Sequence, residues 1–177
     1  MLFRSARILA GYERPHEGTV TLRGAPIPAR GWHPVQLVMQ HPEKAVNPRW
    51  TMRRILNEGW TPGAELLEAL GVRQAWMDRR PAELSGGELQ RFCVARALGP
   101  GTRMLVADEM TAMLDAITQA QIWQVALREA KERRIGMLVI SHERALIRRI
   151  CDRIVDFERL VGRSGIGPPR DGDAVIN

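Results

Sequence analysis

The stretch Met104-Leu105-Val106-Ala107-Asp108-Glu109 places four apolar residues directly before two carboxylates. Four apolar residues are too few for a helix and enough for a buried strand, so we predict a strand over Met104–Ala107. The flanking segments have helical spacing, with one helix predicted over Gly87–Leu98 and another from about Leu114. A second apolar run, Gly136–Ile140, follows the second helix. Strands that alternate with helices predict an α/β fold, with a parallel sheet and helices packed on it.

Further elements are predicted outward from this centre. In chain order they are a short strand over Gly18–Gly24 with a turn after it, a strand over Val35–Met39, two helices between Thr51 and Val72 that are separated at Trp60–Gly63, a helix over Glu143–Ile150 and a strand over Arg153–Phe157. The helix that starts near Leu114 is expected to turn five apolar residues toward the sheet, namely Leu114, Ile117, Trp123, Leu127 and Ala130. From Gly162 the Gly/Pro-rich sequence predicts a loose tail.

The composition is that of one globular domain. The chain has 177 residues, of which 45% are hydrophobic and 26% charged, and its mean hydropathy is −0.22. These values exclude a disordered or fibrous protein and provide enough apolar side chains for a core. The sequence has no uninterrupted apolar run of about 18 residues and no N-terminal signal pattern, so we expect neither a membrane span nor export. A cytosolic location is expected.

The net charge of +6 does not predict nucleic-acid binding. Lys44 and Lys131 are the only lysines among 26 basic residues, and the arginines are interspersed with acidic residues instead of forming one basic stripe. Cys93 and Cys151 are far apart, each in an apolar-periodic segment and neither in a CxxC or Cys/His cluster. We therefore expect two buried thiols rather than a disulfide or a zinc site.

The stretch Leu84-Ser85-Gly86-Gly87-Glu88 has two interpretations. Ser85 as N-cap and Glu88 three residues later form a capping box, which many helices have for stability alone. Two adjacent glycines at a helix start also expose backbone N–H groups, which a phosphate can approach without meeting a Cβ. A cap does not need two glycines, but taken alone this stretch favours the cap.

Polar residues follow each predicted buried strand. Asp108 and Glu109 stand at a strand end where, in parallel sheets, ligands bind; an aspartate there can hold Mg²⁺ and the next carboxylate can polarise a water. His142, after Ile140-Ser141, would end a strand beside Asp108 and Glu109 and could contact a γ-phosphate. The amide of Gln40 could sense a metal ion or an attacking water. Each has an ordinary alternative: a solvated strand end, a structural histidine, or a loop glutamine.

The order of these stretches resembles a known family. Gln40, Leu84–Glu88, Met104–Glu109, Met113-Leu114-Asp115 and His142 are similar to the Q-loop, signature motif, Walker B, D-loop and H-loop of ATP-binding cassette (ABC) ATPases. The resemblance covers about residues 6 to 162. Gln40-His-Pro, Val46-Asn-Pro-Arg49 and Thr118-Gln-Ala-Gln-Ile122 are similar to the peptide, opine and nickel importer subfamily. The chain departs from the family pattern at Met110, where proline is usual, and at Ala112-Met113, where Ser-Ala is usual.

The resemblance implies a P-loop NTPase-like fold with a helical subdomain and a partial N-terminal antiparallel β portion. It also implies the cofactors ATP and Mg²⁺ and a role for each motif. Two ATPase subunits, identical or different, would pair head to tail, and the signature residues would contact the partner's ATP. The residues implied in nucleotide binding are Gln40, Ser85, Gly86, Gly87, Glu88, Asp108 and Asp115. Of these, Gln40 and Asp108 would also hold Mg²⁺. Glu109 would be the general base, and His142 would hold the γ-phosphate.

The implied activity is ATP hydrolysis coupled to solute import. The partners would be membrane permease subunits and, indirectly, a solute-binding protein, at the cytoplasmic face of the inner membrane, with no nucleic acid. Two alternatives stay open. One is a soluble ABC ATPase without a membrane partner, and the other is a non-catalytic subunit that lends only its signature half-site.

The family's phosphate-binding loop ends in Gly-Lys-Ser/Thr before a helix similar to Ala6–Tyr12. Neither lysine of this chain follows a glycine, so the sequence contains no such loop. We expect the chain to be truncated, lacking the first strands and this loop, and to be inactive alone. The expected organisation is an incomplete ATPase domain over 1–162, with a helical subdomain at about 41–98, and a tail over 163–177.

Overall fold

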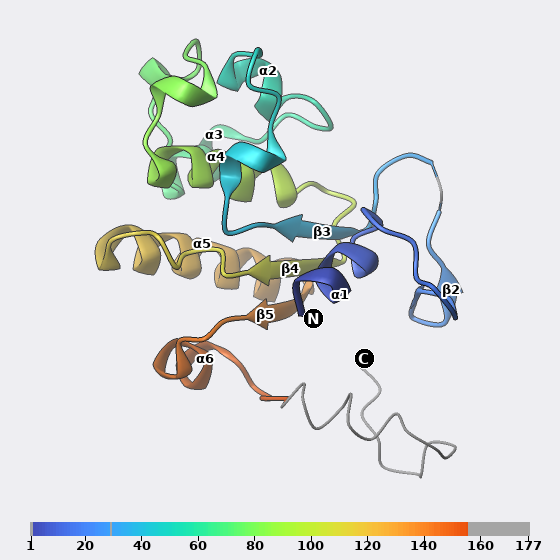
Figure 1. Ribbon diagram of the computed structural model, residues 1–177. Coiled ribbons are helices and arrows are strands. Elements are labelled where there is room, and N and C mark those ends of the chain that lie inside the picture. Colours follow the sequence, from blue (N-terminus) through green and yellow to red (C-terminus); the bar gives the residue numbers. More distant parts are fainter. Residues whose placement is uncertain (1, 29, 156–177) are drawn as a thin grey trace.

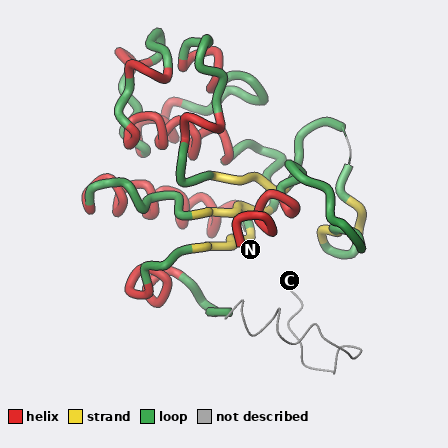
Figure 2. Tube along the Cα trace, viewed as in Figure 1, coloured by secondary structure: helices red, strands yellow, loops and turns green. Residues whose placement is uncertain are grey.

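The computed structural model describes residues 2–28 and 30–155, and its centre is a parallel sheet (Figures 1 and 2). The sheet has the order β3 (Val35–Val38), β4 (Met104–Asp108), β5 (Gly136–Ile140), with both pairs parallel. Val35 pairs with Met104, which pairs with Gly136, so the three strands start level. The predicted parallel α/β sheet is therefore confirmed, and its three carboxyl ends lie at one edge.

Alternate residues of each strand belong to two separate apolar clusters. In β4, Leu105 and Ala107 pack with the helices α4 (Gly86–Ala97) and α5 (Ala116–Arg133), whereas Val106 packs with Ala6 and Ala10. Because successive strand side chains point to opposite faces, the two clusters lie on the two faces of the sheet. Both faces of β4 are buried, which explains why its sequence is continuously apolar.

Two long helices cover one face of the sheet. α4 (Gly86–Ala97) starts at the N-cap Ser85, and α5 (Ala116–Arg133) starts at the N-cap Asp115. The inward face predicted for α5 is wrong at Ile117, whose side chain is 82% exposed. At about 100° per residue, Ile117 lies about 140° around the helix from the buried Ile122. The buried residues of α5 are Ile122, Trp123, Val125, Ala126 and Ala130.

The region before α4 consists of short helices, as predicted. α2 (Met52–Leu56) and α3 (Ala64–Ala69) are separated by the break at Trp60–Gly63. The 3₁₀ turns η1 (Pro42–Ala45), η2 (Gln74–Trp76) and η3 (Pro81–Glu83) complete this region. Its apolar residues belong to the same cluster as the sheet residues Leu105 and Ala107. Its status as a separate subdomain over 41–98 stays a prediction.

The N-terminal part consists of one helix and one hairpin. α1 (Leu2–Leu9) packs on β3 and β4 at the face opposite α5 (Figure 1). The short strand and following turn predicted over Gly18–Gly24 correspond to β1 (Thr21–Leu22) and its turn, and β1 pairs with β2 (Ala25–Pro26) in an antiparallel hairpin, which confirms the predicted N-terminal antiparallel β portion. The chain reverses because Arg23 and Gly24 both have positive φ, 53° and 77°, as the two central residues of a tight hairpin turn require.

The last described element is α6 (Arg144–Ile150), with Glu143 at its N-cap. Residues 153–155 are not in a strand, so the strand predicted over Arg153–Phe157 is wrong in its described part, and the rest lies outside the described residues. Among the described residues β5 pairs only with β4, so residues 153–155 add no further strand to the sheet. The predicted tail from Gly162 also lies outside the described residues. Within 2–28 and 30–155, no helix has the length and apolarity needed to cross a membrane.

Candidate functional site

The carboxyl edge of the sheet brings together four residues that the sequence singled out. Asp108 is the last residue of β4 and pairs in register with Ile140 of β5, so Glu109 and Ser141-His142 leave the sheet side by side. The Glu109 N–H donates to the Ile140 carbonyl at 2.9 Å, extending the strand pairing by one residue. We call Asp108, Glu109, Ser141 and His142 the carboxylate edge.

The Glu109 carboxylate is held by the segment after β5. The His142 backbone N–H donates to its Oε1 at 2.8 Å, and the Ser141 hydroxyl donates to its Oε2 at 3.4 Å. The side chain is 16% exposed, whereas that of His142 is 98% exposed, with Nε2 at 3.7 Å from Glu109 Oε1. Glu109 has φ of +49°, a strained conformation that costs of order 1–3 kcal/mol and is typical of functional sites.

Asp108 is a buried carboxylate, only 6% exposed. Burial raises its pKa, and the adjacent charge of Glu109 raises it further. Mg²⁺ is commonly bound through one or two carboxylates together with phosphate oxygens, and Asp108 fits that pattern better than it fits a cage made by protein alone. The described part of the chain contains no cluster of three or more His, Cys, Asp or Glu side chains suited to a metal. Mg²⁺ binding at Asp108 stays a prediction.

Gln40 lies near the same edge. Val38 pairs in register with Ala107, so Gln40 and Glu109 are each two residues beyond a paired position. Gln40 is half-buried. Its position is compatible with a second oxygen ligand beside Asp108, and its role stays a prediction.

The start of α4 forms a second group with the start of α5. Ser85 Oγ accepts from the Glu88 N–H at 3.3 Å, and Glu88 Oε2 accepts from the Ser85 N–H at 2.7 Å, so the capping box exists. A pocket of about 430 Å³ nevertheless opens in front of this helix start, lined by Ser85, Gly86, Gly87, Glu88 and Asp115. A Cβ on Gly86 would meet nothing within 4 Å, so the helix start is open to a ligand. We call this space the α4–α5 pocket.

Asp115 closes the α4–α5 pocket from the α5 side. Its Oδ1 accepts from the backbone N–H groups of Thr118 at 2.9 Å and Ile117 at 3.1 Å. The hydrogen bonds from Thr118, the backbone one first, lower the pKa of Asp115. In this structure Asp115 acts as a helix cap at the pocket rim, and its predicted part in nucleotide binding stays a prediction.

Two arginines also line the α4–α5 pocket and were not predicted as site residues. Arg73 comes from the loop before η2, with its guanidinium 5.3 Å from the ring centre of Trp76. Arg91 comes from α4, and burial lowers its pKa. No local signal marks Arg73, because it joins this pocket only through the folding of the helical region. Both would attract an anion to the helix start.

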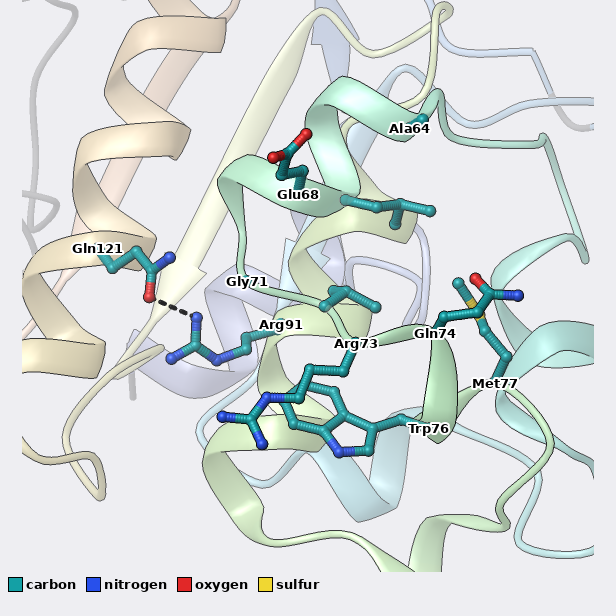
Figure 3. Close-up of a pocket in the computed structure, with 11 residues that line it drawn as sticks. Ala64, Glu68, Gly71, Arg73, Gln74, Trp76, Met77, Arg91 and Gln121 are labelled. Carbon is teal, nitrogen blue, oxygen red and sulfur yellow. Dashed lines mark hydrogen bonds between the residues drawn. The ribbon is translucent and has the colours of Figure 1, made fainter.

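A neighbouring pocket of about 560 Å³ lies between α3, η2, α4 and α5 (Figure 3). Arg91 is shared by both pockets and donates to Gln121 Oε1 at 2.7 Å. It also donates to the Leu70 carbonyl. These bonds tie α4 to α3 and α5, so we interpret the arginine as a structural clamp on this side.

The predicted site residues thus fall into two groups. The α4–α5 pocket holds the signature and D-loop residues and is lined by none of Gln40, Asp108, Glu109 and His142.

Gln90 and Thr111 connect these regions and were assigned no role from sequence. Thr111 is 3% exposed and Gln90 1% exposed. A buried polar residue in an apolar helix face is a signal that would have marked Gln90.

The cysteines do not belong to either group. Cys93 is buried as predicted, and burial raises the pKa of its thiol to about 11. Cys151 is only half-buried, so the expectation of two buried thiols is wrong for this residue, which directly follows α6. α6 itself contributes no fully buried residue, which explains the exposure of its neighbour.

Comparison with known sequences identifies the family. The family model described as ABC transporter matches residues 5–112, more than half of the chain. The nickel import ATP-binding protein NikE of Shigella dysenteriae is 32% identical over 183 aligned residues, covering 92% of this chain and 68% of NikE. NikE of Rhodospirillum rubrum is 36% identical over 171 residues, covering 85% of this chain and 61% of NikE. The chain therefore spans between 61% and 68% of the length of these relatives.

A solved structure confirms the fold. The ATP-binding cassette MJ0796, in a dimeric post-hydrolysis state bound to ADP and Pi, matches with a TM-score of 0.68 over 83% of this chain and 72% of that chain. At 21% identity this likeness supports the P-loop NTPase-like fold and nothing beyond it. The family model and the two NikE sequences show the family as well as the fold. This chain belongs to the ABC transporter family and is similar to its nickel-import ATP-binding proteins.

Proposed function

We propose that the chain is the ATP-binding subunit of an ABC importer and couples ATP binding and hydrolysis to solute uptake. The observation that carries the proposal is the carboxylate edge, where the Glu109 carboxylate is oriented by His142 and Ser141 beside the buried Asp108. A solvated strand end would not need a strained backbone and two hydrogen bonds to fix one carboxylate.

Glu109 is the general base in this proposal. Its two oxygens are held by the segment after β5, which orients the carboxylate so that it can take a proton from an attacking water. The exposed imidazole of His142 would contact the γ-phosphate. Gln40 and Asp108 would hold Mg²⁺, which, when bound, neutralises phosphate charge.

The α4–α5 pocket would contact the ATP of a second ATPase subunit. The helix start after Ser85 offers the backbone N–H groups of Gly86 and Gly87 to an anion, and Arg73 and Arg91 add positive charge. Glu88 stabilises the helix start through the capping box. Asp115 would border the nucleotide from the α5 side.

The proposed partners follow from the roles of the carboxylate edge and the α4–α5 pocket. They are a second ATPase subunit, permease subunits in the inner membrane and, indirectly, a solute-binding protein, with the chain at the cytoplasmic face and no nucleic acid. The solute class is nickel, a peptide or an opine; the two NikE relatives support nickel.

A second candidate function is a non-catalytic subunit that lends only its α4–α5 pocket. The favouring observation is that neither Lys44 nor Lys131 follows a glycine, so the 177 residues contain no Gly-Lys-Ser/Thr loop, whereas they do contain the residues that line the α4–α5 pocket. In both functions we propose that the chain does not hydrolyse ATP alone.

The test is purification of the tagged chain from its source cells in mild detergent. We expect permease subunits and a second ATPase with a Gly-Lys-Ser/Thr loop to co-purify, and the complex to hydrolyse ATP. Recovery of an active ATPase without membrane proteins would instead support the soluble alternative. Native turnover in a complex carrying Glu109→Gln would support the non-catalytic role.

A further inference from the structure

Gln90 bridges the two segments that carry the predicted catalytic and metal residues. It lies in α4 and is 1% exposed. Its Nε2 donates to the Met39 carbonyl at 3.1 Å and to the Met110 carbonyl at 2.7 Å. Met39 directly precedes Gln40, and Met110 directly follows Glu109. One amide group therefore fixes the backbone next to both residues.

The rest of the Gln90 side chain shows that the amide NH₂ is the group that matters. Within the described residues its Oε1 is buried and meets no hydrogen-bond donor. A buried polar atom without a partner is unfavourable, and a residue kept only for packing would be apolar. The NH₂ group supplies two donors without a charge, which is what two buried carbonyls require.

The position of Gln90 on α4 connects the two groups of site residues. The helix begins at the α4–α5 pocket with Gly86, and Gln90 lies one turn further along. A shift of α4, such as an anion at its start would cause, therefore acts on the backbone beside Gln40 and Glu109 through this bridge. We propose that Gln90 is a positioning residue that couples the α4–α5 pocket to the carboxylate edge.

This inference rests on the proposed function, and its expected effect is on turnover rather than on ATP affinity. Loss of the bridge frees the backbone around Glu109 and Gln40, and small misplacements of catalytic groups reduce rates strongly. In a complex whose Gln90 subunit also carries a Gly-Lys-Ser/Thr loop upstream of these residues, we expect Gln90→Met to lower kcat by at least about tenfold while KM for ATP changes less than about twofold. The Mg²⁺ concentration needed for half-maximal rate should rise.

A matched control separates positioning from stability. Gln36, at the amino end of β3, donates its amide to the His33 carbonyl at 2.6 Å, so Gln36→Met also removes an amide–carbonyl bond. It does so away from the carboxylate edge. We expect Gln36→Met to keep kcat near the native value even where both variants melt earlier. Equal kcat in the Gln90→Met and native complexes would overturn the proposal.

A second variant adds a pH readout. In Gln90→Glu a carboxylate would face two carbonyl oxygens, and its protonated form would restore one of the two donated bonds. The kcat of this variant relative to the native complex should therefore rise as the pH falls. A ratio that does not change with pH would contradict the donor role.

A measurement on the native chain tests the Gln90 bridge even if the Gln90 variants fail to fold. By NMR, both Nε2 protons of Gln90 should exchange slowly with solvent, because each is bonded to a buried carbonyl. Fast exchange of either proton would overturn the bridge. If the native complex itself showed no ATPase activity, the proposed function would fail, and the slow exchange would still decide whether Gln90 holds the two segments together.

Discussion

The backbone N–H of His142 donates a 2.8 Å hydrogen bond to the carboxylate of Glu109, although 33 residues separate the two in the chain. The bond forms because β4 and β5 are neighbouring parallel strands that end level, so the residues after them meet. The charge of Glu109 is thereby fixed by the segment that also carries the His142 imidazole. The proposed general base, Glu109, and the proposed γ-phosphate contact, His142, therefore hold each other in position.

The buried Asp108 predicts a trade-off between function and stability. Burial, and then the charge of Glu109, raise the pKa of Asp108, so its ionised form is disfavoured in the folded state. We expect the isosteric neutral variant Asp108→Asn to have a higher Tm than the native chain at pH 7.5, and the complex that contains it to lose ATPase activity. Differential scanning calorimetry checks the first expectation.

The Tm difference should depend on pH with a definite sign. Below about pH 4, Asp108 is protonated in both the folded and the unfolded chain, so its burial does not lower the stability of the folded state. As the pH rises from there to the raised folded pKa, the native chain loses stability relative to Asp108→Asn, and above that pKa the difference is constant. A variant less stable than the native chain at pH 7.5 would show that the Asp108 carboxylate is stabilised instead.

Two substitutions at the start of α4 separate capping from ligand contact. Ser85→Ala removes the cap and should cost about 1 kcal/mol of unfolding free energy. Gly86→Glu should leave the Tm near native, since a Cβ there meets nothing within 4 Å and a carboxylate suits a helix start. In the complex, however, Gly86→Glu places a negative charge in the α4–α5 pocket and should abolish hydrolysis, whereas Gly86→Ala should be milder. ATP hydrolysis at the native rate by the Gly86→Glu complex would show that the helix start serves only as a cap and contacts no nucleotide.

Trp32 packs against three glycines from separate segments. A Cβ on Gly99 or Gly101 would lie 2.3 or 2.5 Å from the Trp32 ring, and one on Gly59 would lie 2.5 Å from it. Gly101→Ala should therefore destabilise the chain by about 1–3 kcal/mol, as overpacking does. The control is Gly136→Ala, whose Cβ would be 3.7 Å from its nearest neighbour. Urea unfolding of both variants checks this, and equal midpoints would contradict the packing.

Local patterns predicted the centre of the fold and the carboxylate edge. β4 could be predicted because both of its faces are buried, which makes its sequence continuously apolar up to Asp108. The same parallel alternation predicted that His142 would leave the sheet beside Glu109. These features depend on residues adjacent in the chain and on one general rule of topology.

Features that depend on distant contacts could not be predicted in this way. The exposure of Ile117 depends on where α5 meets the sheet. The second strand of the N-terminal hairpin depends on a positive φ at Arg23, which an arginine rarely adopts. The bonds of Gln90 reach across 51 and 20 residues, so no local pattern reveals them. Arg73 reaches the α4–α5 pocket for the same reason.

The chain alone should not bind ATP. In this family phosphate affinity is expected to come mainly from backbone N–H groups and the lysine of a Gly-Lys-Ser/Thr loop, which the 177 residues do not contain. Isothermal titration of the isolated chain with Mg-ATP should give no binding heat up to about 1 mM nucleotide. Micromolar affinity would mean that a different phosphate site exists in these residues.

The assignment of Glu109 as the base is tested most directly by the ATP turnover of a complex in which this subunit carries Glu109→Gln and also a Gly-Lys-Ser/Thr loop upstream of these residues. Glutamine keeps an acceptor oxygen for the His142 N–H, so the fold and nucleotide binding should persist. A general base contributes roughly 10²- to 10⁴-fold in rate, and we expect kcat to fall by at least about that lower factor while ATP affinity stays native. A near-native rate in the Glu109→Gln complex would contradict the assignment of this carboxylate as the base.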